Sequence, residues 1–147
     1  MTNPKERYEL KITYGLDEKE EEDLLTKLGQ YNLEKSNGLS SDPGEPICLA
    51  LRNEDNQAVG ALFGQAIYRS LYIRHLWVNE KHRGHGYGKT LVKEAERIAK
   101  ENGCISAFTS TYSFQAPQFY HALGYETFGV FDRLPDGIRK LFLGKSL

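Results

Sequence analysis

Residues 82–90 read "HRGHGYGKT" and lie between an apolar, strand-like segment and an amphipathic, helix-like one. The three alternating glycines of this stretch carry no side chains that would keep an anion away from the backbone amides. The helix that follows has a positive N-terminal end, which favours a bound phosphate group. Arg83 and Lys89 add positive charge at the rim. The stretch therefore predicts a main-chain cradle for a phosphate-bearing ligand.

Two common nucleotide-binding motifs do not match this stretch. A triphosphate-binding loop needs the pattern G-x-x-x-x-G-K-[S/T], and Arg83 stands where its first glycine belongs. Such a protein also needs an acidic residue at the end of a second strand to hold magnesium, and residues 104–112 end without one. The dinucleotide pattern G-x-G-x-x-G fails because the glycines here alternate as G-x-G-x-G. Both nucleotide classes are therefore disfavoured.

The first half of the chain predicts strands and one helix. Residues 8–15 alternate apolar and polar side chains, which predicts a strand. Residues 16–31 predict a helix that is capped by Asp17 and Glu20 and carries three leucines on one face. Residues 46–78 predict three strands, and the turn-like sequences "RNEDNQ" and "YRS" between them predict antiparallel pairing.

The second half predicts a crossover followed by a hairpin. Residues 86–103 carry one apolar stripe and predict a helix, and residues 104–112 return as a strand. This strand is expected to be a parallel neighbour of residues 71–78. Residues 115–123 predict a short helix, and residues 125–147 predict a closing hairpin. The whole predicts an α/β fold with a mixed sheet.

The segment from about Leu71 to Gly124 resembles the core of the GNAT superfamily of acetyl-coenzyme A-dependent N-acetyltransferases. Residues 83–88 match its signature [Q/R]-x-x-G-x-[G/A], and "LWV" before them matches the end of its strand. The sequence "PQFYHALGYE" is similar to its second signature. The resemblance implies one domain over residues 1–147, with a mostly antiparallel sheet of about six or seven strands, a splayed parallel pair and flanking helices.

The resemblance also implies a reaction and a site. It implies acetyl transfer from acetyl-coenzyme A to a primary amine of a small molecule or protein, with Tyr120 protonating the departing thiolate and no metal cofactor. The alternative for Tyr120 is a tyrosine packed in the core. Ser113 stands where the family often has a cofactor-binding asparagine, so that contact is in question. The implied cofactor-binding residues are Leu76, Trp77, Val78, Arg83, Gly84, His85, Gly86, Tyr87, Gly88, Lys89 and Ser113.

The general base is not identified by the resemblance. Family members often hold a carboxylate or histidine at the positions that Tyr72 and Arg74 occupy here. Arg74 cannot accept a proton at neutral pH. A water chain is the leading hypothesis, and His75 is the second, although strand alternation is expected to turn it to the opposite face. Tyr72 and Arg74 are candidate acceptor-binding residues; Arg74 either binds an anionic acceptor or pairs with a neighbour in the sheet.

Composition narrows the functional classes further. The chain has 147 residues, with 19 Lys+Arg against 20 Asp+Glu, so nucleic acid and acidic membranes are not expected partners. The N-terminal residues lack the apolar core of a signal peptide, and no apolar run is long enough to span a bilayer. A cytoplasmic location follows as an expectation. Cys48 and Cys104 are expected to be buried thiols.

Several alternatives stay open at this stage. A non-catalytic acyl-coenzyme A sensor is the main rival, and a nucleotide hydrolase is a weaker one. His82 and His85 form a potential metal pair, but the sequence offers no third ligand close by. Residues 29–46 and 131–140 are candidate acceptor-binding loops. The expected partner is an amine-bearing acceptor, and the family's habit allows a homodimer.

Overall fold

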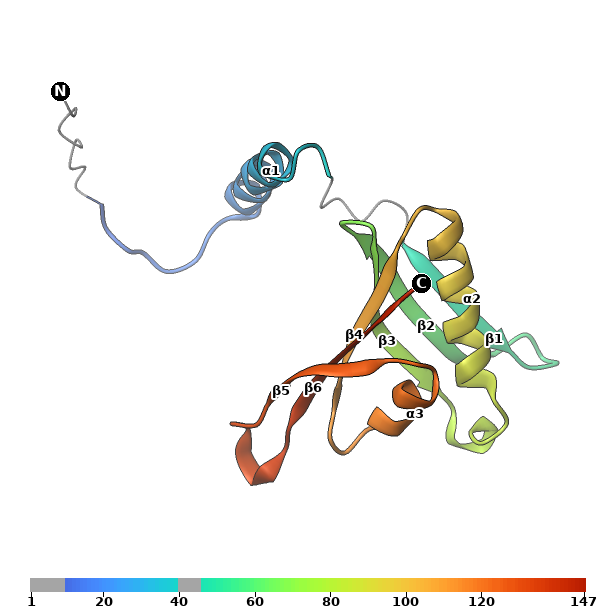
Figure 1. Ribbon diagram of the computed structural model, residues 1–147. Helices are drawn as coiled ribbons and strands as arrows, with labels where there is room; N and C mark the ends of the chain where they lie inside the picture. Colours follow the sequence, from blue (N-terminus) through green and yellow to red (C-terminus); the bar gives the residue numbers. More distant parts are fainter. Residues whose placement is uncertain (1–9, 40–45) are drawn as a thin grey trace.

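The computed structural model describes residues 10–39 and 46–147 of the chain (Figure 1). Its centre is a six-stranded sheet in the order β1-β2-β3-β4-β6-β5. The strands are β1 Ile47–Arg52, β2 Ala58–Ile67, β3 Ser70–Val78, β4 Ser106–Tyr112, β5 Glu126–Phe131 and β6 Lys140–Ser146. The helices are α1 Glu18–Lys35, α2 Tyr87–Glu101 and α3 Pro117–Ala122, with short 3₁₀ turns at Glu80–His82 and Pro135–Gly137. The expected mixed α/β fold is confirmed.

Antiparallel hairpins join β1, β2 and β3, as their alternating sequences predict. The β2–β3 connection is tight because Tyr68 and Arg69 both have positive φ, at 48° and 60°. That geometry belongs to the two-residue turns whose twist matches the flanking strands. In the closing hairpin, β6 lies between β4 and β5 and pairs with both, so β5 forms the edge of the sheet.

The one parallel pairing joins β3 and β4, as predicted. It covers only Ser70 to Ile73 on β3, opposite Ser106 to Thr109 on β4. Beyond these residues the two strands no longer pair. The Thr109 hydroxyl donates a 2.9 Å hydrogen bond to the Ile73 carbonyl at the last paired position. The two strands therefore separate at a fixed point and leave an opening between their C-terminal ends.

Helix α2 covers one face of the sheet. The apolar stripe of α2 consists of Leu91, Val92, Ala95 and Ala99, all of which are buried. It packs with side chains from several strands into a single core, whose largest buried members include Leu62, Leu71, Ile73, Leu143 and Val92. None of the helices in the part of the chain that the structure describes is long and apolar enough to cross a membrane.

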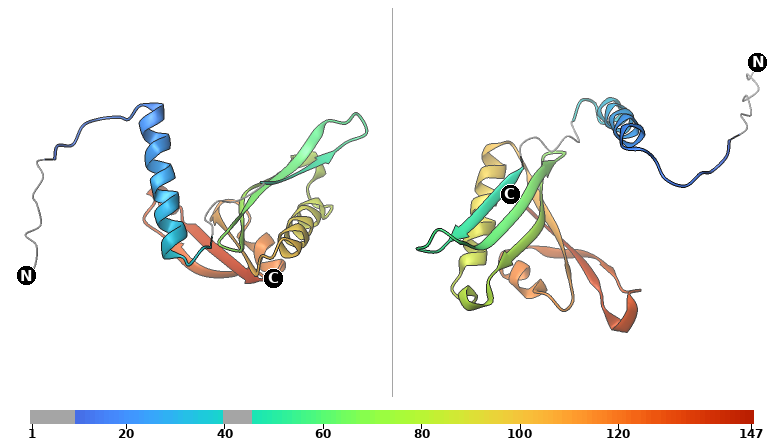
Figure 2. Two further views of the ribbon diagram at one scale, coloured as in Figure 1. Left: turned by 90° about the horizontal axis from the view of Figure 1, so that it is seen from above. Right: turned by 180° about the vertical axis from the view of Figure 1, so that it is seen from behind.

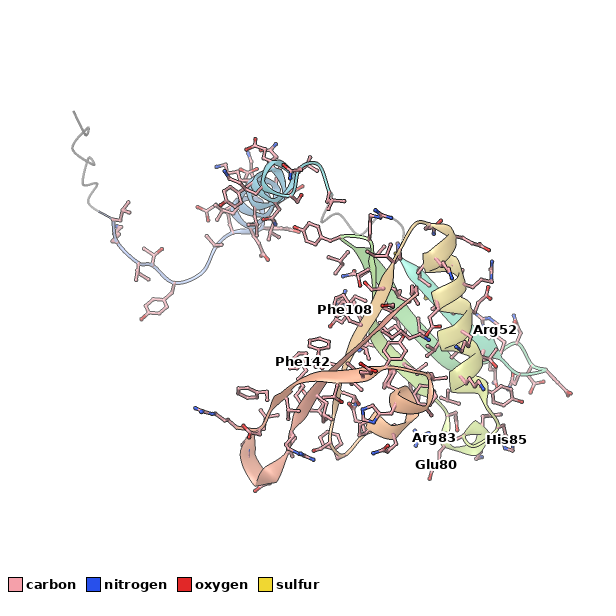
Figure 3. All side chains as sticks on the ribbon, viewed as in Figure 1. Arg52, Glu80, Arg83, His85, Phe108 and Phe142 are labelled. Carbon is pink, nitrogen blue, oxygen red and sulfur yellow. The ribbon has the colours of Figure 1, made fainter. Side chains whose placement is uncertain are left out.

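The opposite face of the sheet carries apolar side chains that helix α2 does not cover. We call it the open face and define it by Cys48, Ala50, Phe63, Trp77, Phe108 and Phe142. Phe63 and Trp77 are 47% and 54% exposed. Figure 3 shows Phe108 and Phe142 on the side of the sheet away from α2.

Two expectations are wrong for the N-terminal part of the chain. Residues 10–15 form no strand, and Leu10 and Ile12 are almost fully exposed; residues 8 and 9 lie outside the described part. Cys48 is exposed rather than buried, whereas Cys104 is buried as expected. Both expectations rest on local sequence, namely the alternation of residues 8–15 and the apolar neighbours of Cys48, and local sequence does not determine what covers a segment.

Helix α1 forms as predicted, and Asp17 and Glu20 make a reciprocal capping box at its start. It has no buried residue, and it stands apart from the sheet and from α2 in Figure 1 and in the right panel of Figure 2. Leu24, Leu25 and Leu28 are each at least half exposed. Residues 10–39, which we call the arm, therefore add nothing to the core of their own chain.

A buried ion pair ties α2 to the C-terminal half of the sheet. Glu96 on α2 is 8% exposed, and Lys145 on β6 donates to both of its carboxylate oxygens at 3.1 Å. Lys145 also donates to the Leu123 carbonyl at 2.9 Å, and the Tyr125 hydroxyl donates to Glu96 at 3.1 Å. Burial, followed by the neighbouring Glu96 charge, raises the pKa of Tyr125, which keeps its hydroxyl protonated as a donor.

We predict that replacing Lys145 with Met lowers the free energy of unfolding by about 2–3 kcal/mol, because it leaves a buried carboxylate without its close cation. Lys93 is the matched control, since its amine lies 3.7 Å from the same carboxylate but its side chain is 51% exposed. Lys93→Met is expected to change stability little. Urea unfolding of both variants is the measurement, and equal losses would contradict this account of the pair.

Candidate active site

A cleft of about 880 Å³ opens where β3 and β4 separate. Its walls come from the C-terminal ends of both strands, from the loop before α2 and from α3. Figure 3 shows Glu80, Arg83 and His85 grouped at the N-terminal end of α2, which forms one end of this region. Segments that are far apart in the sequence therefore meet around one opening.

The glycine loop is shaped for a main-chain contact with an anion. Gly84 and Gly86 have φ values of 78° and 83°, a conformation that favours glycine, and Gly86 is the N-cap of α2. A Cβ atom added to either residue would meet nothing within 4 Å. Within residues 10–39 and 46–147, no protein acceptor is recorded for the backbone N–H groups of residues 84–89. The amides therefore face open space.

Gly88 serves a different purpose from the other two glycines. Its φ is not positive, and a Cβ atom there would lie 3.2 Å from the ring of Phe119 on α3. The glycine thus allows the first turn of α2 to approach α3 closely. Because α3 also carries Tyr120, this contact fixes the distance between the open amides and the phenol.

Arg83 has a structural contact in addition to its place at the rim. Its Nε donates a 2.8 Å hydrogen bond to the Val78 carbonyl, five residues earlier. This bond ties the start of the loop to the end of β3. Lys89 lines the cleft and has no ion-pair partner among the described residues.

Tyr120 reaches the cleft from α3, and it is 7% exposed. Its ring packs edge-on against Phe119 and Tyr125, with centroids 5.1 and 5.6 Å away. Burial raises the pKa of the Tyr120 phenol, and a hydrogen bond with the Thr109 side chain opposes this in part. The phenol is therefore protonated at neutral pH and is held at the point where the strands part.

His75 does not turn away from Arg74 as strand alternation predicts. The register of β2 with β3 shifts between Phe63 and Gly64, which pair with His75 and Ile73, so Arg74 is an extra, bulged residue. As a result, Arg74 and His75 are both exposed and both line the cleft. The His75 ring packs edge-on against Phe63 on the open face, with centroids 6.3 Å apart.

The cleft gathers most of the residues that the sequence singled out, but it does not gather all of them. Tyr72 lies outside its lining and stacks on Phe108 with ring centroids 4.8 Å apart. Ser113 is also outside, because its hydroxyl accepts from the Arg139 amide at 3.1 Å. His85 is exposed beside Tyr87 and does not line the cleft. The predicted lining residues that the structure brings together are Arg74, Leu76, Trp77, Val78, Arg83, Gly84, Gly86, Tyr87, Gly88, Lys89 and Tyr120.

The cleft is also lined by residues that no sequence motif indicates as part of a site. Thr109 and Gln115 have no motif signal, and their place follows only from the separation of β3 and β4. His82 was considered only as a metal ligand, yet it lines the cleft, and its buried Nδ1 has no hydrogen-bond partner among the described residues. Over those same residues, no group of three metal-binding side chains comes together.

Comparisons with known proteins agree with this geometry. Residues 8–125 match the sequence model described as the Acetyltransferase (GNAT) family. Blasticidin-S acetyltransferase of Streptomyces morookaense is 34% identical over 110 residues, which cover 74% of this chain and 81% of that protein. An acetyltransferase of Agrobacterium fabrum is 31% identical over 121 residues, covering 82% of this chain and 86% of that protein.

Solved structures show the same fold. The crystal structure of an acetyltransferase from Bacillus cereus is 36% identical, with a TM-score of 0.83 over 93% of this chain and 98% of that one. A structure from Bacillus anthracis, described as a complex with acetyl coenzyme A, is 20% identical, with a TM-score of 0.64 over 72% of this chain and 65% of that one.

We predict that Gly86→Ala raises the Kd for coenzyme A about tenfold, because a methyl group strains the positive φ and enters the space above the amides. Gly103→Ala is the matched control. Gly103 lies just beyond the other end of α2, also has a positive φ (+88°), and likewise has nothing within 4 Å of an added Cβ. Isothermal titration calorimetry is the measurement. A similar change of Kd in both variants would mean that strain alone, and not the cradle, is responsible.

Proposed function

This chain belongs to the GNAT family of acetyltransferases, and we propose that it transfers the acetyl group of acetyl-coenzyme A directly to a primary amine, with Tyr120 as the general acid. The observation that carries the proposal is the placement of two groups in one cleft. The open amides of the glycine loop are at one end, and a buried, protonated phenol lies where β3 and β4 part.

The diphosphate of acetyl-coenzyme A is proposed to bind to the amides of residues 84–89. The residues fit this group because the amides lack protein acceptors in the described part of the chain and the space above Gly84 and Gly86 is open. The α2 N-terminus and the Lys89 side chain add favourable charge. His85 and Tyr87 complete the rim in this proposal.

The pantetheine arm is proposed to lie along Leu76, Trp77 and Val78, where β3 has lost its parallel neighbour. A strand edge without a partner offers backbone donors and acceptors to an extended ligand. The amide near Val78 would then face the oxygen that becomes negative as the amine attacks the thioester. The bond between Arg83 and the Val78 carbonyl supports this arrangement, since it holds the strand end in place.

Tyr120 is proposed to give its proton to the coenzyme A thiolate as the thioester bond breaks. Phenols and thiols have similar ordinary pKa values, so the proton transfer is nearly balanced. Thr109 lies beside the phenol, and its hydroxyl donates to the Ile73 carbonyl at the point where the strands part. Ser113 has no part in this arrangement.

The amine must lose a proton before or during attack. A water chain to solvent is the leading proposal, and His75 is the second candidate because the bulge at Arg74 brings it to the cleft. The pH–rate profile of a His75→Ala variant separates the two routes. A profile that keeps its wild-type shape leaves the water route.

The acceptor is proposed to be an amine that also carries an anionic group. Arg74 is exposed at the cleft, and no carboxylate of the described residues lies within ion-pairing distance of it. Tyr72 lies two residues before the bulged Arg74, and its ring stacks on Phe108 instead of lining the cleft, so it is not proposed to contact the acceptor. The similarity to blasticidin-S acetyltransferase makes blasticidin S the first compound to test.

We predict that Tyr120→Phe lowers kcat by about 10²- to 10⁴-fold without changing the Kd for coenzyme A, because the ring is kept and only the proton donor is lost. The protonated phenol is the active form, so on the alkaline side wild-type kcat should fall as the pH rises through the raised pKa of Tyr120, above the ordinary value of about 10. Tyr125→Phe is the control, since it removes a buried hydroxyl outside the cleft. If kcat of Tyr120→Phe stayed within threefold of wild type, Tyr120 would not be the acid.

We predict that a library of primary amines, assayed by release of free thiol from acetyl-coenzyme A, contains acceptors with a carboxylate or phosphate group. For these, Arg74→Gln should raise KM about tenfold through the lost charge-assisted bond, with kcat little changed. For uncharged amines it should have no effect. The absence of any acceptor above background thiol release would favour a non-catalytic acyl-coenzyme A sensor.

A further inference from the structure

The arm carries an apolar surface that no other part of the described chain covers. On α1, Leu24, Leu25, Leu28 and Tyr31 lie on one face and are 50–60% exposed. Before the helix, Leu10, Ile12 and Tyr14 alternate and are 89–103% exposed. A single helix of this length is only marginally stable in water and depends on packing of its apolar face. The arm therefore requires a partner surface.

Residues 46–147, which we call the body, also present an exposed apolar surface. The open face has Phe63 and Trp77 about half exposed and also exposes Cys48 and Ala50. At its border, β1 pairs with β2, and its other edge has no partner among residues 10–39 and 46–147. A free strand edge accepts an added strand, and an apolar sheet face requires a covering layer. The arm contains one segment for each purpose.

We propose that two copies of this chain exchange arms, so that α1 of one copy covers the open face of the other and residues 10–15 add a strand to its β1 edge. The dimensions agree, since a helix of 18 residues is about 27 Å long and the alternating segment is about as long as β1. In such a dimer, residues 10–15 would form the expected first strand on the sheet of the other copy, and Cys48 would be buried under the other copy's helix.

The position of the arm favours exchange over closure onto its own body. The arm stands away from the sheet in Figure 1 and in the right panel of Figure 2, and six residues, 40–45, link Leu39 to Pro46 in the sequence. A short connection between an element and the rest of its chain favours such exchange. The similarity to the Bacillus cereus structure agrees. Residues 46–147 are about seven tenths of the chain, so a TM-score of 0.83 over 93% of it requires the arm to superpose as well.

The exchange has a consequence for the cleft. His75 and Trp77 line the cleft, and both lie on the side of the sheet that the arm would cover. The acceptor side of the cleft is then built from two chains, with α1 of the second copy as its outer wall. The glycine loop and Tyr120 remain within one chain. The dimer itself does not depend on the proposed reaction, and its test needs no substrate.

The test is the mass of the protein in solution, measured by light scattering after size-exclusion chromatography. Wild-type protein should have twice the 16.7 kDa mass of the chain. Leu24→Glu with Leu28→Glu should raise the dimer dissociation constant at least a hundredfold, because charges would enter the apolar contact. The control pair, Thr26→Glu with Gln30→Glu, adds the same charge to the exposed, opposite face of α1 and should remain dimeric.

A second variant distinguishes exchange from other dimers and does not alter the contact surface. Six Gly/Ser residues inserted between positions 40 and 45 would let each arm reach its own sheet, and the protein should become largely monomeric with Cys48 protected from thiol reagents. A monomeric wild type would overturn the proposal. So would a wild-type dimer that survives the leucine substitutions or is unaffected by the longer connection.

Discussion

The structure depends on the point at which β3 and β4 stop pairing. Up to Ile73 and Thr109 the two strands are parallel neighbours, and the Thr109 hydroxyl closes the last pair by bonding to the Ile73 carbonyl. Beyond it, each strand has an unpaired edge, which a folded protein tolerates only where something else takes the backbone groups. The same threonine that ends the pairing also interacts with Tyr120. The Thr109 side chain therefore marks the point where the cleft opens and also contacts Tyr120, the phenol at that point.

Much of the fold is present in local sequence patterns. Alternation and turn residues predict β1, β2 and β3, and the apolar stripe of α2 predicts which of its sides is buried. The parallel pairing of β3 with β4 follows from the crossover between them. The sequence predicts the glycine loop because open backbone amides need residues without side chains. Gly88 is an exception, since its missing side chain leaves room for the ring of Phe119 and not for a ligand.

The features that sequence patterns missed all depend on contacts between distant segments. The bulge at Arg74 arises from the register of β3 against β2, so strand alternation gave the wrong side for His75. Ser113 is drawn to Arg139 across the sheet. The exposure of Cys48 and of residues 10–15 reflects where the arm lies, and no local pattern distinguishes an arm that folds back from one that extends.

The close approach of Gly88 to Phe119 has a wider consequence for how this fold diversifies. The glycine loop and the helix that carries Tyr120 touch directly at this contact, so the two are packed as one unit. Arg74 and His75 line the same cleft from the bulge of β3, away from the contact between Gly88 and Phe119. Under the proposed function, mutations at Arg74 and His75 would alter which amine is modified and leave this packed unit intact, so new specificities would be accessible in small evolutionary steps.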